Sequence, residues 1–350
     1  MPEYVELLER IAARLVNYRH GEIPPIYLSH VARWVEQFAF EDRLTILSET
    51  NRMLERRYVT QDEMTQSVEQ LLTLALAGLQ TEQLNRVQFL EIARKGGSQR
   101  SLTEMMRQAG LELFGRDFTQ PQETPTIFLY VDDCLFTGNT VLNDLRDWLI
   151  AQEPGSSIER LCLLFHTVHS GGRYYVDTEI GRDQRLGRLK DKTLIQSTKA
   201  IQNSRSRDDT KFTSHAYECF WPETPATLST DLQRITSQLP SEARLYRPTS
   251  RTPHSSLFST PETRSIVERN FLEKGAFIMA RPKTVQLSMR PLGYESLPSL
   301  GFGAMYVTHR NISNNCPLVL WWGDPNAPAY HPLRAWYPLI PRLANEGQAS

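Results

Sequence analysis

The stretch FLYVDDCLFTGNTVLNDL, from Phe128 to Leu145, decides the expected fold. Its first letters continue a buried apolar run, which predicts a strand over residues 126–131. Two adjacent acids end that run, and a short polar turn then leads into an amphipathic helix expected over residues 140–150. This order of buried strand, acidic end, glycine turn and helix is typical of open α/β sheets, which bind ligands at the carboxyl ends of their strands.

The centre of this stretch is compatible with two kinds of catalytic site. Tyr130, Val131, Asp132 and Asp133 spell a Tyr-x-Asp-Asp turn, which in a polymerase palm binds metal ions between antiparallel strands. Such a site needs a further aspartate on an upstream strand, and the upstream aspartates lie in helical or loop-like surroundings. The residues after Asp133 lead into a helix, so the polymerase interpretation is disfavoured.

The other interpretation is a site for a ribose and a phosphate. Asp132 and Asp133 can each accept a hydrogen bond from one of two vicinal ribose hydroxyls. The turn that follows offers backbone N–H groups and a helix N-terminus, which bind a phosphate without a lysine or arginine. Its residues are Thr137, Gly138, Asn139 and Thr140. The structural alternative is an acidic loop that caps a helix.

The string YVDDCLFTGNT resembles the ribose-phosphate loop of type I phosphoribosyltransferases, in which an apolar strand, paired acids and a few variable residues precede T-G-x-T. This resemblance implies a doubly wound parallel α/β sheet and binding of phosphoribosyl pyrophosphate with Mg2+. It makes Asp132 and Asp133 the catalytic pair that orients the ribose, while Mg2+ is held through the substrate with no protein ligand assigned. The implied activity is that of a glycosyltransferase acting at the ribose C1.

A second loop is expected to bind the pyrophosphate. In the family, a short loop after an earlier strand does so through backbone N–H groups, and the segment after the strand expected over 87–92 is similar in position and glycine content. It comprises Arg94, Lys95, Gly96, Gly97 and Ser98. Ordinary strand-to-helix turns also carry glycines, which leaves a purely structural role open.

The flanking segments resemble a narrower group of proteins. The helix with HVARWVEQF and the late run GFGAMYVTHRNISNNCPLVLWW are similar to phosphoribosyltransferase-like proteins of bacterial conflict systems, some of which are effectors in retron and related anti-phage operons. This resemblance implies a toxic effector of antiviral defence that binds phosphoribosyl pyrophosphate or a related nucleotide. It leaves open an oligomer and an operon partner, either a reverse transcriptase with its RNA and DNA or a DNA-binding protein. The alternative is a catalytically inactive module that senses a ribose phosphate or nucleotide and acts through protein or nucleic-acid partners.

Three regions are expected along the chain. Residues 1–85 carry helical periodicity and predict a helical extension or cap. Residues 86–225 predict the α/β core, with a loop-rich insertion over 170–215 that carries ten Lys or Arg against six Asp or Glu. Residues 226–350 predict an α+β region, a candidate for the hood that recognises the base, with a helix beginning at Pro261 and strands over 304–308 and 318–322.

Composition argues against several classes of protein. A net charge of −1 and a pI near 6.7 do not favour nucleic-acid binding over the whole surface. The four cysteines form no C-x-x-C pair, which argues against a zinc knuckle or a disulfide scaffold. The sequence shows neither a leader nor an apolar run long enough to cross a bilayer, so a cytoplasmic protein without membrane association is expected.

Three other groups of residues have both a functional and a structural interpretation. His166 and His169 could contribute to a metal site, although no third ligand is indicated and strand-end histidines are favoured. Aromatic residues of the C-terminal region could stack on bases, but a core position is favoured for Trp321, Trp322, Trp336 and Tyr337. A polar run could line an acceptor site, but a hairpin loop is favoured for His309, Arg310, Asn311, Asn314 and Asn315.

One departure from the family pattern concerns the catalytic lid. Type I enzymes usually carry a long flexible loop between the pyrophosphate helix and the acidic strand, whereas only residues 111–125 are available here. The lid is therefore either shortened or replaced by the basic segment 170–215. Either case puts ordinary transferase turnover in question.

Overall fold

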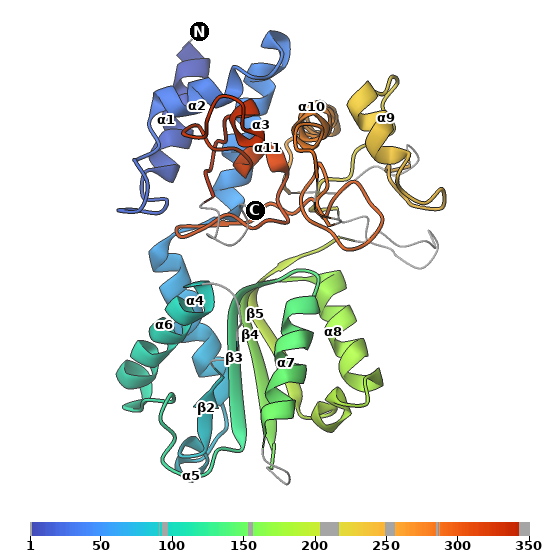
Figure 1. Cartoon of the computed structure of the whole chain (residues 1–350). Coiled ribbons are helices and arrows are strands. Elements are labelled where there is room, and N and C mark those ends of the chain that lie inside the picture. The colour runs from blue at the N-terminus through green and yellow to red at the C-terminus, as the bar shows by residue number, and fades with distance from the viewer. Residues whose placement is uncertain are drawn as a thin grey trace. The chain divides into compact units, whose positions relative to one another are not determined.

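The structure is a computed structural model that describes residues 2–90, 92, 97–152, 157–203, 217–248, 256–284, 286 and 288–342. The chain divides into two compact units (Figure 1). Unit 1 comprises Met1–Thr60 and Ser204–Ser350, and unit 2 comprises Gln61–Asn203. These units differ from the three ranges expected from the sequence, because the N-terminal helices and the C-terminal region form one unit.

Unit 2 is built on a parallel sheet with the strand order β2-β3-β4-β5. Its strands are β2 (Val87–Phe89), β3 (Ile127–Leu135), β4 (Arg160–His169) and β5 (Thr193–Ile201). Its helices are α4 (Gln61–Leu76), α5 (Thr81–Leu84), α6 (Gly97–Phe114), α7 (Asn139–Ala151), α8 (Ser170–Arg182) and the 3-10 turn η2 (Leu186–Leu189). Helices α4 and α6 pack against one face of this sheet, and α7 and α8 cover the other face (Figure 1).

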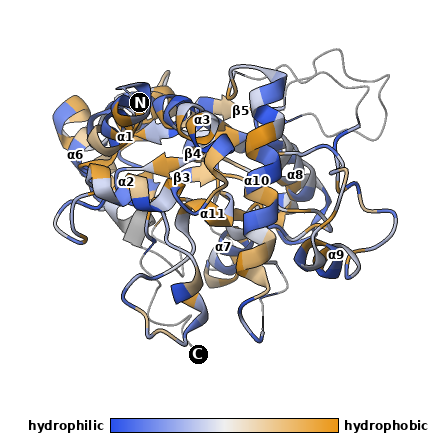
Figure 2. Cartoon of the chain, turned by 90° about the horizontal axis from the view of Figure 1, so that it is seen from above, coloured by the Kyte–Doolittle hydropathy of each residue, from blue (hydrophilic) through white to orange (hydrophobic). Residues whose placement is uncertain are grey.

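The two central strands are apolar because helices cover both of their faces. β3 and β4 are hydrophobic along most of their length (Figure 2). Side chains alternate between the faces, so Phe128 and Tyr130 join the buried cluster of α7 and α8, and Leu129 is buried on the α4 and α6 face. This packing confirms the mixed α/β fold with a parallel sheet that the strand run predicted.

The prediction of a loop-rich insertion over 170–215 is wrong for residues 170–203. These residues form α8, η2 and β5, and β5 pairs in parallel with β4. β5 is one of the two edge strands of the sheet, and several of its side chains are only half-buried or are exposed, which explains its polar sequence TLIQSTKAI. The rest of the predicted insertion, residues 204–216, lies outside the described residues.

Unit 1 is largely helical with a two-stranded parallel sheet, β1-β6. Its N-terminal elements are α1 (Pro2–Leu15), α2 (Leu28–Val35), η1 (Phe40–Asp42), α3 (Arg43–Arg57) and β1 (Tyr58–Val59). Its later elements are α9 (Thr230–Thr236), α10 (Pro261–Met279), β6 (Val307–Thr308), α11 (Leu318–Trp321) and η3 (Pro332–Ala335). Among the helices of the described residues, none is long and apolar enough to span a membrane.

The predictions for the C-terminal region are confirmed in one element and wrong in another. Helix α10 begins at Pro261, and the hydroxyl of Thr260 accepts the N–H of Thr263 at 3.2 Å as an N-cap. Of the strand expected over 304–308, only β6 forms. The strand expected over 318–322 is the helix α11 instead, because a short, fully buried apolar run has no periodicity that separates strand from helix.

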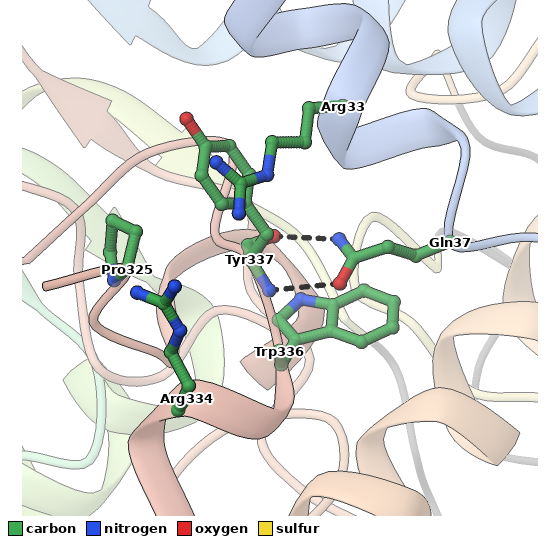
Figure 3. A pocket seen from close by; sticks show the side chains of 6 residues that line it. All are labelled: Arg33, Gln37, Pro325, Arg334, Trp336 and Tyr337. Atoms are coloured by element: carbon green, nitrogen blue, oxygen red, sulfur yellow. Dashed lines mark hydrogen bonds between the residues drawn. The ribbon is translucent and has the colours of Figure 1, made fainter. Parts of the chain in front are cut away.

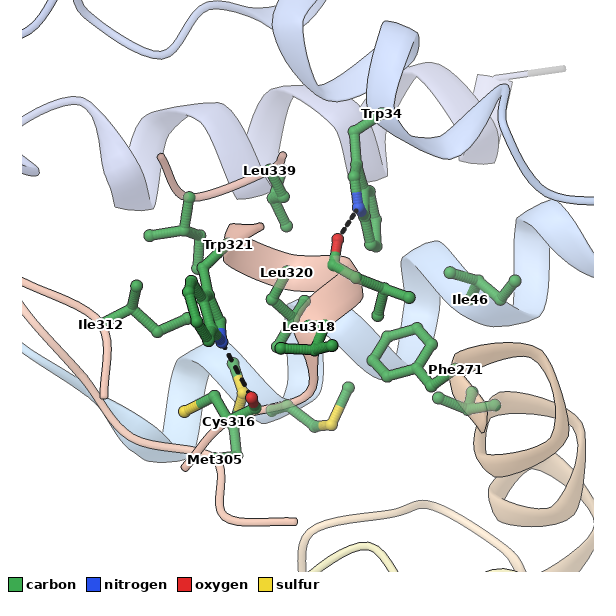
Figure 4. Packing of buried hydrophobic residues seen from close by; sticks show 14 of the residues in the cluster. Trp34, Ile46, Phe271, Met305, Ile312, Cys316, Leu318, Leu320, Trp321 and Leu339 are labelled. Atoms are coloured by element: carbon green, nitrogen blue, oxygen red, sulfur yellow. Dashed lines mark hydrogen bonds between the residues drawn. The ribbon is translucent and has the colours of Figure 1, made fainter. Parts of the chain in front are cut away.

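The tryptophans expected in the core are part of the hydrophobic core of unit 1 (Figure 4). The indole N–H of Trp321 donates to the carbonyl of Cys316 at 2.8 Å, and that of Trp34 donates to Val319 at 2.9 Å. Trp336 is also buried, whereas Trp322 and Tyr337 pack against the core from half-buried positions. These bonds satisfy the indole N–H groups of Trp34 and Trp321 inside the apolar core.

Candidate functional site

Asp132 and Asp133 lie near the carboxyl end of β3, which continues through both residues to Leu135. β3 pairs in parallel with β2 and β4, and Asp132 lies opposite Phe165. A polymerase turn needs a hairpin of antiparallel strands, so this pairing excludes the polymerase interpretation. A carboxylate oxygen of Asp132 accepts the backbone N–H of Asp133 at 2.8 Å, and both side chains are half-buried.

The carboxylates of Asp133 and Asp144 repel that of Asp132 near this end of β3. Burial raises the pKa of Asp132 well above its ordinary value, and the charges of Asp133 and Asp144 raise it further. The hydrogen bond from the backbone of Asp133 acts in the opposite direction but does not offset burial and charge. A cationic ligand would relieve this repulsion, and strongly perturbed carboxylates of this kind cluster at functional sites.

Asp144, which reasoning from the sequence missed, joins the site from α7. Its carboxylate accepts the hydroxyl of Tyr130 at 3.1 Å, and both side chains are buried. Burial and the charges of Asp132 and Asp144 raise the pKa of Tyr130, so the phenol stays protonated and remains a donor. The available signal was the position of Asp144 in the sequence, because it is an acid on the otherwise apolar face of the helix that contains Val141 and Leu145.

The turn after β3 forms an uncapped helix N-terminus. Gly138 is the N-cap of α7 with φ of 83°, in the left-handed region that favours glycine, and it makes no side-chain capping bond. The first turn of α7 carries no acidic residue, and Asn139 and Thr140 are exposed. N–H groups at such a helix start, together with the helix dipole, suit a phosphate. The structure thus places Asp132, Asp133 and residues 137–140 on one continuous strand, turn and helix.

The start of helix α8 packs closely against the turn after β3. A Cβ on Gly172 would lie 1.8 Å from the carbonyl oxygen of Phe136, and a Cβ on Gly138 would lie 2.6 Å from a methyl group of Val176. The backbone N–H of Gly172 donates to Nδ1 of His169, which caps α8, at 3.3 Å. Gly172 was not assigned a role from the sequence, although a glycine pair directly after a buried strand was the signal for a close approach.

The two histidines of β4 do not form a metal pair. They are three residues apart in a strand, so their side chains project from opposite faces of the sheet. Nδ1 of His166 is 2.8 Å from the hydroxyl of Thr167. Burial, followed by the charge of Lys199, lowers the pKa of His166 to about 4, so this histidine is neutral at pH 7. In the part of the chain that the structure describes, no group of three or more His, Cys, Asp or Glu could hold a metal ion.

The predicted pyrophosphate loop lies mostly outside the described residues. Arg94, Lys95 and Gly96 belong to that part of the chain. Gly97 and Ser98 are the first residues of α6, which follows β2 and packs against β3. A pyrophosphate role for this loop therefore stays a prediction.

The polar run of the C-terminal region belongs to unit 1 and forms turns. The N–H of Thr308 donates to the carbonyl of Asn311 at 2.8 Å, and that of His309 donates to Val59 at 2.8 Å. The side-chain amide of Asn315 donates to the carbonyl of Tyr294 at 2.8 Å, and Asn314 accepts the N–H of Tyr294. These hydrogen bonds give the run a structural role, and an acceptor-binding role for it stays a prediction.

The comparison with protein families agrees with the resemblance of the β3–α7 segment. No curated protein matches the chain. A solved structure, "Structure of AQ2163 protein from Aquifex aeolicus", is 11% identical and covers 50% of this chain and 83% of that chain, with a TM-score of 0.26. The PRTase-CE family matches residues 31–342, which is most of the chain and includes both the acidic pair and the turn. This chain therefore belongs to the PRTase-CE family, the phosphoribosyltransferases of conflict systems.

Proposed function

We propose that unit 2 binds phosphoribosyl pyrophosphate at the carboxyl edge of its sheet and transfers or cleaves the ribosyl group at C1. The observation that carries this proposal is the β3–α7 segment, where two repelling carboxylates near the end of β3 are followed, after a short turn, by an uncapped helix N-terminus. The carboxylates suit ribose hydroxyls and a developing cation, and the helix N-terminus suits the 5-phosphate.

Each part of this segment has a defined role in the proposed reaction. Asp132 and Asp133 accept hydrogen bonds from the two ribose hydroxyls and so fix the sugar. The bond between C1 and the pyrophosphate oxygen breaks, the pyrophosphate leaves with the electron pair, and a nucleophile forms the new bond at C1. The carboxylates stabilise the positive charge that develops on the ribosyl group in this step. The backbone N–H groups of residues 137–140 hold the 5-phosphate throughout.

The donor set at this site also fits Mg2+. Mg2+ prefers oxygen ligands and usually binds through one or two carboxylates together with substrate phosphates. Asp132 and Asp133 supply carboxylate oxygens at the end of β3, and their repulsion favours a nearby cation. When bound, Mg2+ would neutralise charge on the leaving pyrophosphate.

A second candidate function is a sensor that binds the sugar phosphate without turnover, and one observation favours it. The segment expected to form a catalytic lid, residues 111–125, begins in α6, and its later part is fixed along the outer edge of β2. The carbonyl of Phe118 accepts the N–H of Phe89 at 2.9 Å, and the N–H of Gln122 donates to Asn85 at 3.0 Å. This segment therefore covers the edge strand, and the residues 170–203 proposed as a replacement lid belong to the core.

Binding of the sugar pyrophosphate tests both candidates. Isothermal titration of the full chain with phosphoribosyl pyrophosphate should show binding that depends on Mg2+ and is at least tenfold weaker in Asp133→Asn. Asp191→Asn is the matched control, because Asp191 is exposed just before β5, at the amino edge of the sheet, and asparagine tolerates its φ of 63°. The absence of binding to the wild type would refute the proposal.

Product analysis then separates the enzyme from the sensor. Release of pyrophosphate from labelled substrate by the wild type, and its loss in Asp132→Ala plus Asp133→Ala, supports the enzyme. Binding without release supports the sensor. For the proposed role as a toxic effector of defence, expression should arrest growth in the wild type but not in the double variant. Growth arrest that persists in the double variant would contradict a role of this site in toxicity.

A further inference from the structure

A small pocket in unit 1 has no role in the proposed reaction. Its volume is about 140 Å³, and it lies between α2 and the C-terminal segment that contains η3 (Figure 3). Its lining residues are Arg33, Gln37, Pro325, Arg334, Trp336 and Tyr337. All of them belong to the same compact unit.

The walls of this pocket are held by hydrogen bonds. The side-chain amide of Gln37 donates to the carbonyl of Tyr337 at 2.8 Å and accepts its N–H at 2.9 Å, as Figure 3 shows. The indole N–H of Trp336 donates to Val319 at 2.9 Å, and the hydroxyl of Tyr337 is 2.9 Å from Nδ1 of His30. These polar groups are occupied within the protein, so the chemistry of the pocket depends on its two arginines.

Arg33 and Arg334 line the pocket from exposed positions, and neither has an ion-pair partner among the described residues. Arg33 lies over the ring of Tyr337, with 4.1 Å between the guanidinium carbon and the ring centroid. Stacking of this kind leaves the N–H groups at the guanidinium edge available to a ligand. No carboxylate among the described residues lies within 4.0 Å of either guanidinium group, so both charges are available to an anion.

We infer that this pocket binds a phosphate monoester of a small molecule or inorganic phosphate itself. A phosphate monoester carries about −1.5 to −2 charges at pH 7, which matches the two guanidinium groups. Guanidinium groups bind phosphate oxygens through paired N–H donors. A cavity of about 150 Å³ holds one molecule of the size of benzene, so the pocket has room for one phosphate group. This site is separate from the α7 turn that the proposed function assigns to the 5-phosphate.

The test must distinguish the pocket from the turn of α7. Thr140→Glu places a carboxylate at that helix start, where it repels phosphate, so phosphate bound by this variant reports on the pocket. Titration of the full-length Thr140→Glu chain with inorganic phosphate at low ionic strength should show one site. Adding Arg33→Gln and Arg334→Gln should weaken that binding at least tenfold. Adding Arg56→Gln and Arg234→Gln, which remove the same charge from exposed positions on α3 and α9, should leave it unchanged.

Further titrations of the Thr140→Glu chain identify the source of the phosphate. Ribose 5-phosphate that binds tenfold tighter than inorganic phosphate assigns the pocket to an organic monoester, and equal affinities assign it to free phosphate. The inference is overturned if Thr140→Glu binds no phosphate, if the Arg33 and Arg334 substitutions change nothing, or if acetate binds as tightly as phosphate. A 5′-phosphorylated oligonucleotide that binds tighter than ribose 5-phosphate would overturn the assignment to a small molecule.

Discussion

Replacing Gly172 by alanine should disturb the turn after β3, whose residues 137–140 are proposed to bind the 5-phosphate. Gly172 itself has no role as a ligand-binding residue in this proposal. The new Cβ would lie 1.8 Å from the carbonyl oxygen of Phe136, whereas real Cβ contacts below 3.0 Å are essentially unknown. The carbonyl oxygen is backbone and the new Cβ is fixed directly to the backbone, so the start of α8 and the turn after β3 must separate by roughly 1 Å. Displacements of about 1 Å in catalytic geometry cost on the order of 100-fold in rate. We therefore expect turnover to fall by about 100-fold, and affinity for the sugar pyrophosphate to fall as well.

The same substitution should lower stability modestly. Overpacking costs about 1–3 kcal/mol, which corresponds to a fall in Tm of a few degrees in calorimetry. Gly181→Ala is the matched control, because it lies in the same helix and its Cβ would have no heavy atom within 4 Å. This control should gain about 0.5–1 kcal/mol from helix propensity and bind ligand normally. Gly172→Ala with unchanged binding and unchanged Tm would show that α8 does not hold the turn.

Three further predictions concern the carboxylates of Asp132 and Glu268. Asp132→Asn should raise the Tm of the ligand-free protein at pH 7, because the raised pKa of Asp132 means that its ionisation opposes folding. This gain in Tm should be absent below the unfolded pKa of about 3.9. It should grow as the pH rises through the folded pKa of Asp132. Affinity for the sugar pyrophosphate should rise over the same pH window, and binding should release a proton. Calorimetric titration in buffers of different ionisation enthalpy measures this proton release. An affinity that does not depend on pH would contradict this coupling. Glu268→Gln should lower the free energy of unfolding by about 3–5 kcal/mol, because this carboxylate is 1% exposed and accepts Nε of Arg264 at 2.9 Å and the N–H of Trp221 at 2.8 Å. Denaturant unfolding should show little change for Glu273→Gln on the same helix.

The strand and helix around the acidic pair were predictable because local and tertiary preferences agree there. The apolar run of β3 is buried on both faces, and α7 carries its apolar residues on one face, as the sequence predicted. The strand nevertheless continues past Val131 to Leu135. Its extension depends on pairing with β4, which lies opposite Cys134 and Leu135, and the local sequence does not encode that pairing.

Other parts of the fold and of the site depend on contacts between segments that are distant in the sequence. They could therefore not be predicted from the local sequence. β5 is polar because it lies at the edge of the sheet, and only its pairing with β4 makes it a strand. α11 consists of apolar residues buried by unit 1, and that burial suits a helix as well as a strand. Asp144 acquires its role only because α7 brings it to Tyr130, fourteen positions away in the chain.

Several features of unit 2 that restrict or oppose folding lie around the turn after β3. Asp132 has a raised pKa, Tyr130 is buried against a carboxylate, Gly138 adopts a left-handed backbone, and Gly172 admits no side chain. Natural proteins break local rules mainly at functional sites, where ligand binding needs a geometry or a charge that the fold alone does not favour. Ordinary packing does not require paired carboxylates beside an uncapped helix start. Binding of a cationic sugar with a phosphate does require this arrangement. The unfavourable free energy of this turn therefore supports a binding role more strongly than the sequence motif alone.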